Sequence, residues 1–250
     1  MADYIEGKRA VIEALRTGVP CKSVLMADNL KRDSLVEDIL RKAKRANVRV
    51  QQVPRRTLDE KSARGSHQGI MAEAAPFAYA GAGDVLAAAE RDAERNGGAA
   101  LIVALDHITD AGNLGAIIRS AESAGASGII IPNKRSAHVE ASTYKSSAGA
   151  VTHLPIAQVA NLSQTLVSLQ GKGFWVASAT EHAKDHIWDA NLKGKMVLVM
   201  GNEAEGVSRL VLEHSDFLVK LPMRGKVESL NVAQATTACV YEWVRQNRLS

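Results

Sequence analysis

Short, unbroken apolar runs alternate with helical patterns from residue 99 onward, and this alternation constrains the fold most strongly. The runs cover residues 100–105, 128–131, 154–157, 173–179, 195–200 and 217–221. Helical patterns lie at residues 114–124, 142–148, 162–169 and 207–213. Strands of a parallel sheet read as continuous apolar runs, because helices cover both faces of such a sheet. We therefore expect an open parallel α/β sheet with helices on both faces.

A second alternation fills the first 75 residues. The spacing predicts helices at residues 5–15, 35–43 (with Asp33 as cap) and 57–63, and strands at residues 23–27, 48–53 and 70–74. These elements suffice for a small α/β/α domain. The following stretch reads as a linker that passes into a helix. The expected division is an N-terminal domain at 1–75, a linker at 76–98 and a catalytic domain at 99–250.

Positive charge is concentrated near the start of the chain. Of 31 Lys and Arg and 27 Asp and Glu, residues 1–75 hold 15 and 10, which leaves 16 and 17 for the remainder. The first third therefore favours an anionic partner such as nucleic acid, although a solvated basic face explains the charge equally well. Aromatic residues make up 4% of the chain, which argues against a platform that stacks a row of bases.

Several functional classes lack their signatures. There is no dinucleotide or ATP fingerprint and no serine hydrolase motif. The pair His182 and His186 has helical spacing but no third ligand signature, so no metal site is expected. Cys21 and Cys239 are expected to be reduced thiols. Since neither a signal peptide nor an apolar run of about 20 residues is visible, we expect a soluble, cytoplasmic protein.

Polar residues follow three of the predicted strands, at the edge where open α/β sheets bind ligands. In the loop and helix of residues 105–121, Asn113 lies in the capping turn, and Arg119 lies on a helix that is otherwise apolar. A salt bridge to a nearby carboxylate is the alternative role for this arginine. The stretch 197–206 ends a buried strand at Gly201 and then presents Glu203, whose alternative role is to favour a helix dipole.

The third stretch, residues 221–243, begins at a strand end and continues through a polar loop into a helix from Asn231. Strand–loop–helix units of this kind suit a ligand held against main-chain groups. In order, the three stretches carry D-x-x-x-D-x-x-N-x-G-x-x-x-R-S-A, GNE-x-E-G and MRG-x-VESLNV. These resemble the three motifs of the SpoU (TrmH) family of RNA 2′-O-ribose methyltransferases. Ala111 stands where the family usually has proline, a departure that touches no reactive group.

The resemblance spans residues 100–245 and implies a trefoil-knotted, SPOUT-type sheet with an N-terminal RNA-binding domain. It also implies a homodimer formed through the knotted domain, and S-adenosylmethionine as cofactor. Matching positions for the cofactor are Gly201, Leu221, Leu230 and Thr180. Matching polar positions of the active site are Asn113, Arg119, Glu203, Ser229 and Asn231.

The implied reaction is an in-line displacement of a sulfonium methyl group by a ribose 2′-oxygen, so the protein must position and activate a weakly acidic hydroxyl. Arginine is very hard to deprotonate and is therefore a poor base. We therefore expect Arg119 to orient the hydroxyl and a neighbouring phosphate, and that phosphate to assist proton removal. Glu203, Asn113 and Asn231 would hold the arginine and the ribose. Candidate phosphate contacts in the N-terminal domain are Lys8, Arg9, Arg55, Arg56, Arg64 and His67.

The segment RSAHVEASTYKSSAGAVTHLPIAQVANL and the GSHQG loop are similar to the subgroup that methylates a guanosine in 23S ribosomal RNA. One alternative keeps the chemistry and moves it to a tRNA guanosine or a ribosomal adenosine. Another is an RNA-binding or ribosome-assembly protein that kept the fold and lost turnover. The occupied polar motif positions count against a silent protein.

Overall fold

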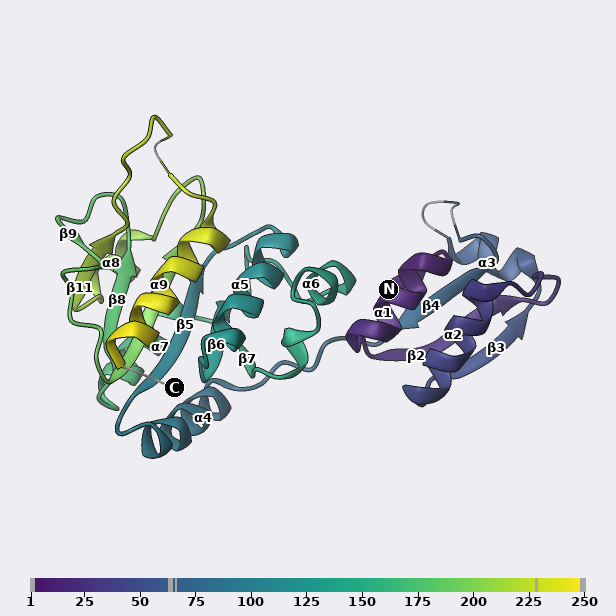
Figure 1. Ribbon diagram of the computed structural model, residues 1–250, viewed down its shortest axis with the longest axis horizontal. Coiled ribbons are helices and arrows are strands. Elements are labelled where there is room, and N and C mark those ends of the chain that lie inside the picture. Colours follow the sequence, from purple (N-terminus) through teal and green to yellow (C-terminus); the bar gives the residue numbers. More distant parts are fainter. Residues whose placement is uncertain (1–2, 63–64, 66, 228, 248–250) are drawn as a thin grey trace. The chain divides into compact units, whose positions relative to one another are not determined.

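The computed structural model describes residues 3–62, 65, 67–227 and 229–247 (Figure 1). The chain forms two compact units, one of residues 1–78 with 139–149 and one of residues 79–138 with 150–250. These limits differ from the expected division, because a short stretch from the middle of the sequence belongs to the first unit. Within the described residues, no helix is long and apolar enough to cross a membrane.

The first unit is a mixed sheet between helices. Its strands lie in the order β1-β4-β2-β3, with β2 parallel to β3 and antiparallel pairing elsewhere. Helix α3 buries Leu58 against one face, on a cluster that includes Leu25 and Met71. Helices α1 and α2 pack together and bury a separate set of apolar residues. The bounds are β1 (Asp3–Glu6), α1 (Lys8–Thr17), β2 (Cys21–Ala27), α2 (Ser34–Arg45), β3 (Arg49–Val53), α3 (Arg55–Lys61), β4 (Ile70–Ala74) and α6 (Ala141–Ser146).

The expected helix at residues 5–15 is wrong at its start. Ile5 lies in strand β1 and pairs with Ala72 of β4. Gly7, with φ of 93°, separates this strand from α1, a conformation that glycine adopts without steric cost. Four residues are too few for periodicity to distinguish a strand from a helix, and the pairing with β4 decides the outcome. The expected cap is confirmed, since Asp33 accepts a hydrogen bond of 2.9 Å from the main-chain N–H of Val36.

The second unit contains a parallel sheet in the order β7-β6-β5-β10-β8-β11-β9. Strand β9 has two residues, including His186, and was not among the strands expected from the apolar runs. The bounds are α4 (Ala82–Arg95), β5 (Ala100–Asp106), α5 (Ala111–Ser123), β6 (Gly128–Pro132), η1 (Ala150–Thr152), β7 (Ile156–Val159), α7 (Leu162–Gln170), β8 (Trp175–Ala179), β9 (Asp185–His186), β10 (Lys195–Gly201), α8 (Arg209–Glu213), β11 (Phe217–Lys220) and α9 (Val232–Asn247).

Helices cover both faces of this sheet, which explains the unbroken apolar runs. Helices α4, α7 and α8 share one core cluster with the strands. Helices α5 and α9 lie side by side (Figure 1) and bury Ile117, Ile118 and Trp243. Helix α4 falls within the expected linker, but its residues Val85 and Ala89 are fully buried in the core. The open parallel α/β sheet expected from the sequence is confirmed.

The last helix is attached to the loop that precedes the central strand β10. Trp243 is 0% exposed, and its indole N–H donates to the carbonyl of Gly194 at 3.3 Å. The side chain of Asn247 accepts from the N–H of Gly194 at 2.9 Å and donates to the carbonyl of Leu192 at 3.1 Å. Gln246 adds a further bond by accepting from the N–H of Leu192 at 2.8 Å. These bonds join the end of the chain to the middle of the sheet.

Replacing Trp243 with alanine should destabilise the second unit by about 3–5 kcal/mol, because a large buried side chain leaves a cavity that the sheet cannot close. Trp243→Phe keeps most of the apolar volume and should cost less. Urea unfolding followed by circular dichroism measures both variants. A loss below about 1 kcal/mol for the alanine variant would contradict the role of this side chain in the core.

Protonation of Glu242 should lower the stability of the protein in acid. The pKa of this nearly buried carboxyl lies below its ordinary value of 4.5, because Arg245 hydrogen-bonds it, although burial opposes that shift. A lowered folded-state pKa gives stability that is complete above pH 4.5 and is lost as the pH falls through the folded value. Glu242→Gln should therefore be less stable than the wild type at pH 7 and should approach it in acid, as measured by urea unfolding between pH 7 and 3. The exposed Glu94→Gln should show no such convergence.

Candidate functional site

The carboxyl ends of four neighbouring strands meet at one edge of the parallel sheet. Asp106 at the end of β5 lies opposite Gly201 at the end of β10. Ala179, at the end of β8, lies beside Met200 of β10 and Val219 of β11. The loops that follow these strands therefore begin from a common edge, which is where ligands bind in open α/β sheets.

Hydrogen bonds join the three motif stretches at this edge. The side-chain amide of Asn113 donates to the Glu203 carboxylate. Asn231 in turn donates to the Asn113 side-chain oxygen at 3.0 Å. Asp110 caps α5 by accepting from the main-chain N–H of Asn113 at 2.6 Å. Ala111 occupies the first helical position, where proline also fits because a main-chain N–H is dispensable there. The side-chain amide of Asn113 thus connects Glu203 and Asn231, which lie 90 and 118 positions away in sequence.

Gly201 is required by the tight turn that presents Glu203. A Cβ at this position would lie 2.2 Å from the carbonyl carbon of Gly206, closer than any side chain permits. Asn202 and Gly206 exchange two main-chain hydrogen bonds of 3.0 and 2.8 Å, and these close the turn. Asn202 also donates from its side chain to the carbonyl of His107 at 2.8 Å.

Asp106 organises the site, although it was not among the site residues expected from the sequence. It is 1% exposed and accepts hydrogen bonds from the N–H of Ser208 at 2.7 Å and from Nδ1 of His107 at 2.6 Å. Its carboxylate therefore connects the end of β5 with the loop after β10. The available signal was an aspartate directly after a fully apolar run, because a buried carboxylate needs hydrogen-bond donors nearby.

Arg119 projects from α5 as an exposed side chain. Within the described part of the chain, it forms no hydrogen bond or ion pair, so the alternative of a structural salt bridge has no support there. Next to it, Ser120 and Thr237 share a hydroxyl hydrogen bond of 2.6 Å that ties α5 to α9. The guanidinium thus comes from a fixed helix and keeps its charge available for a ligand.

The residues expected at the cofactor lie around the same edge. Thr180 and Leu221 follow β8 and β11 directly and are partly buried. Leu230 is 43% exposed, and the same loop exposes the apolar side chains of Met223 and Val227. Apolar side chains exposed beside the polar strand ends suit a ligand with a flat ring and polar groups, as S-adenosylmethionine is. Ser229 is exposed in the same loop.

The expected phosphate contacts in the first unit differ in their exposure and in their ion pairing. Arg9 and Arg55 are exposed, and their side chains form no ion pair with described residues. Lys8 is paired with Asp33 at 2.6 Å, and its side chain is 14% exposed. Arg56 is paired with Glu60 at 2.9 Å but remains exposed. Arg64 lies outside the described residues.

His67 was expected to contact phosphate, but the structure buries it. Its ring is buried, Nε2 donates to Asp59 at 2.8 Å, and Nδ1 accepts from the N–H of Gly69 at 3.0 Å. Both ring nitrogens are occupied within the fold, so neither can bind a phosphate while these bonds hold. We leave His67 out of the RNA surface.

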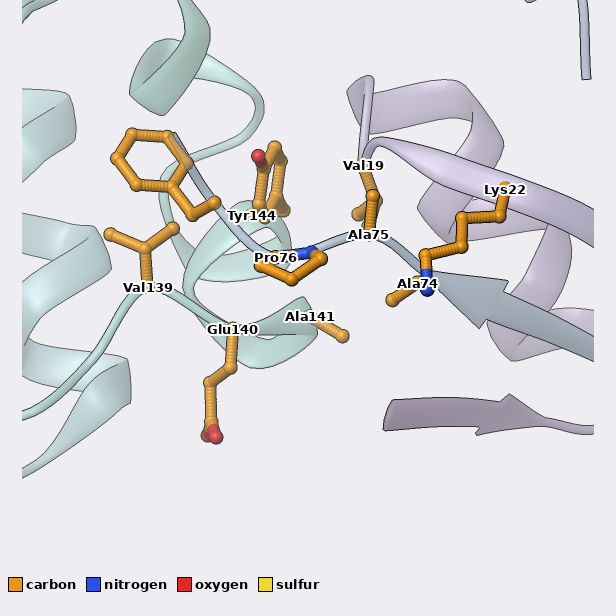
Figure 2. Close-up of a pocket in the computed structure, with 10 residues that line it drawn as sticks. Val19, Lys22, Ala74, Ala75, Pro76, Val139, Glu140, Ala141 and Tyr144 are labelled. Carbon is orange, nitrogen blue, oxygen red and sulfur yellow. The ribbon is translucent and has the colours of Figure 1, made fainter. Parts of the chain in front are cut away.

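A pocket within the first unit contains none of the expected site residues (Figure 2). It has a volume of about 460 Å³, and its lining includes Pro76, Val139 and Tyr144, while the Glu140 carboxylate points away from the other labelled side chains. Among the described residues, no cluster of three His, Cys, Asp or Glu side chains is placed to hold a metal ion. The polar edge of the parallel sheet is therefore the candidate site.

Fold and site together define a SPOUT-type RNA methyltransferase, and comparisons with known proteins agree. The model of the SpoU rRNA Methylase family matches residues 100–241, and a model described as RNA 2'-O ribose methyltransferase substrate binding matches residues 4–80. The chain therefore belongs to the SpoU family. It is an RNA 2′-O-methyltransferase with the family's trefoil-knotted fold, and its methyl donor is S-adenosylmethionine.

Relatives align over nearly the whole chain. YacO of Bacillus subtilis, assigned to the TrmH family of tRNA/rRNA methyltransferases, is 37% identical over 98% of this chain and 96% of its own length. The 23S rRNA (guanosine-2'-O-)-methyltransferase RlmB of Pseudomonas aeruginosa is 40% identical over 94% and 93%. The SpoU methyltransferase AviRb from Streptomyces viridochromogenes, crystallised with AdoMet, superposes with a TM-score of 0.68 at 25% identity, covering 98% of this chain and 90% of that one.

Asn113→Ala removes both hydrogen bonds that join the motif stretches. We expect turnover at saturating RNA and cofactor to fall about 100-fold, because the reacting groups lose their alignment. Cofactor affinity should change little, since the strand-end residues stay in place. Calorimetry and methyl transfer measure the two effects. Wild-type turnover in this variant, or an equal loss in the exposed Asn96→Ala, would contradict the bridging role.

Proposed function

We propose that this enzyme methylates the ribose 2′-hydroxyl of a guanosine in 23S ribosomal RNA. The choice of 23S ribosomal RNA as substrate is supported by the 40% identity with RlmB, which extends across both units of the chain. Because the proposed substrate is ribosomal RNA, we also propose that the enzyme is located in the cytoplasm. A tRNA guanosine is the second candidate, because YacO is assigned to a family of tRNA/rRNA methyltransferases.

We assign the polar residues of the site to substrate positioning. S-adenosylmethionine supplies a methyl group on a sulfonium that is already a good leaving group. Arg119 would donate to the phosphate next to the reacting ribose and orient the 2′-hydroxyl, since a guanidinium binds phosphate through two parallel hydrogen bonds. The bridged amides of Asn113 and Asn231 would hold the ribose, with Ser229 as a further hydroxyl partner.

We propose that a phosphate of the RNA, and not a protein side chain, assists in removing the proton. Arg119 is a donor and does not act as a base at neutral pH. The carboxylate of Glu203 is already bonded to Asn113, so it supports the amide that positions the ribose. The phosphate that Arg119 would hold would then assist in removing the hydroxyl proton. The main-chain edge at Gly201, Leu221 and Thr180, with Leu230, would hold the methyl donor.

The first unit would hold the RNA, as the match of residues 4–80 to a substrate-binding family supports. Arg9, Arg55 and the exposed Arg56 remain candidates for phosphate contact. We also propose a homodimer through the knotted unit. Helix α9 exposes Tyr241 at 47%, an apolar ring that a second copy would cover.

Methyl transfer to unmodified 23S RNA and to tRNA tests the proposal. Arg119→Ala should lower turnover on 23S RNA by about 100- to 1,000-fold, the range for removing one donor that stabilises developing charge. Arg119→Lys should also be impaired, because a single ammonium cannot replace the two-point contact. The label should map to the ribose of one guanosine.

Arg91→Ala, which removes an exposed arginine from α4, is the matched control and should keep wild-type turnover. Label on tRNA alone would move the substrate to the second candidate and leave the residue roles intact. Near-normal turnover by Arg119→Lys would overturn the two-point positioning by this side chain.

A further inference from the structure

The basic surplus of the N-terminal region is concentrated in one short segment. Residues 41–49, with sequence RKAKRANVR, hold five Lys or Arg and no Asp or Glu. Residues 1–75 hold 15 basic and 10 acidic residues, so the rest of that region has ten of each. The surplus of five charges therefore lies entirely within this segment. The net charge of residues 1–75 as a whole does not reveal that the surplus lies in nine residues.

The fold places these cations around one corner of the first unit. Helix α2 ends after Arg45, the chain turns through Asn47 with a positive φ of 54°, and β3 begins at Arg49 (Figure 1). The residues of the turn, Ala46 and Asn47, are exposed, so no bulky side chain covers the corner. Strand β3 ends the order β1-β4-β2-β3, which leaves this side of the sheet without a further strand among the described residues.

Three of these cations have no partner among the described residues. The side chains of Lys44, Arg45 and Arg49 are exposed and form no ion pair or hydrogen bond within the described part of the chain. Arg41 and Lys42 share the carboxylate of Asp38, at 2.5 and 3.8 Å. Five like charges within nine residues repel one another, and an external anion would relieve that repulsion.

Of the cations predicted from the sequence, Arg9 and Arg55 are exposed and unpaired among the described residues, whereas two others have partners within the fold. Lys8 is neutralised by Asp33, and Arg56 is paired with Glu60. Cations in the last turn of a helix also favour the helix dipole, which would account for Lys44 and Arg45. It does not account for Arg49, which lies on β3 beyond the helix. A ligand outside the chain explains all three.

We propose that the α2–β3 corner, formed by Lys44, Arg45 and Arg49, binds the phosphate backbone of the RNA substrate. The proposal rests on the proposed function, because it takes that RNA as the partner. Flexible, exposed cations with no aromatic neighbour in the segment suit contacts that are independent of base sequence. The corner would raise RNA affinity and leave the chemistry at the sheet edge unchanged.

The test is binding of an unmodified 23S RNA transcript to the full-length protein at several salt concentrations. The variant Lys44→Gln/Arg45→Gln/Arg49→Gln should bind at least about ten-fold more weakly near 0.1 M salt. Its slope of log Kd against log salt should fall by about two, since each lost phosphate contact removes about 0.7 from the slope on single-stranded RNA. With methyl transfer as readout, KM should rise while kcat at saturating RNA stays unchanged.

Two further variants separate local charge from other causes. Arg91→Gln/Arg95→Gln/Lys172→Gln removes the same charge from exposed positions of the second unit and should keep most of the affinity and the slope. Lys44→Arg/Arg45→Lys/Arg49→Lys keeps the charge at the corner and should bind as the wild type does. Thermal unfolding checks that all variants are folded.

Equal Kd and slope for the corner and control variants would overturn the proposal. Loss of affinity in the charge-preserving variant would overturn it as well, because charge would then not be the cause. A wild type that binds 23S RNA without methylating it would refute the proposed function, while the comparison of slopes would still decide whether the corner binds RNA.

Discussion

The site depends on the parallel pairing of β5 with β10. The register places Asp106 beside Gly201, although the two lie 95 positions apart in sequence. From these strand ends the chain turns toward Asn113 on one side and Glu203 on the other, so their hydrogen bond forms at the point where the two loops meet. Buried apolar strands hold this register, because a shift would expose their side chains or leave main-chain groups unpaired.

Ionic pairing divides the charged residues of the enzyme into structural and available groups. Glu203 bonds to a neutral amide, and Asp106 bonds to a main-chain N–H and an imidazole, so neither carboxylate neutralises Arg119. Its guanidinium therefore retains full charge for an anionic substrate. In the first unit, Lys8 and His67 are bonded within the fold, while the cations of the α2–β3 corner have no partner among the residues that the structure describes. Which charges remain available for an anionic ligand follows from this pairing.

The conformation of a few small residues gives the site its shape. Gly201 allows the chain to fold back on Gly206 where a methyl group would collide with the main chain. Asn202 then closes the turn through main-chain and side-chain hydrogen bonds. The loop that presents Glu203 is consequently short and held at both ends. A short, fixed loop suits a reaction in which alignment supplies much of the rate enhancement.

The sequence by itself determined the parallel α/β sheet, the three polar stretches at its strand ends and the family. Those features depend on local patterns of apolar runs and on motifs, which a linear reading can detect. Tertiary structure alone decided that Ile5 belongs to a strand, that Asp106 organises two loops and that His67 is buried. It also decided which cations are free, because an ion pair such as Lys8 with Asp33 forms between residues that only folding brings together. Burial and pairing are relations between distant residues, and no local pattern contains them.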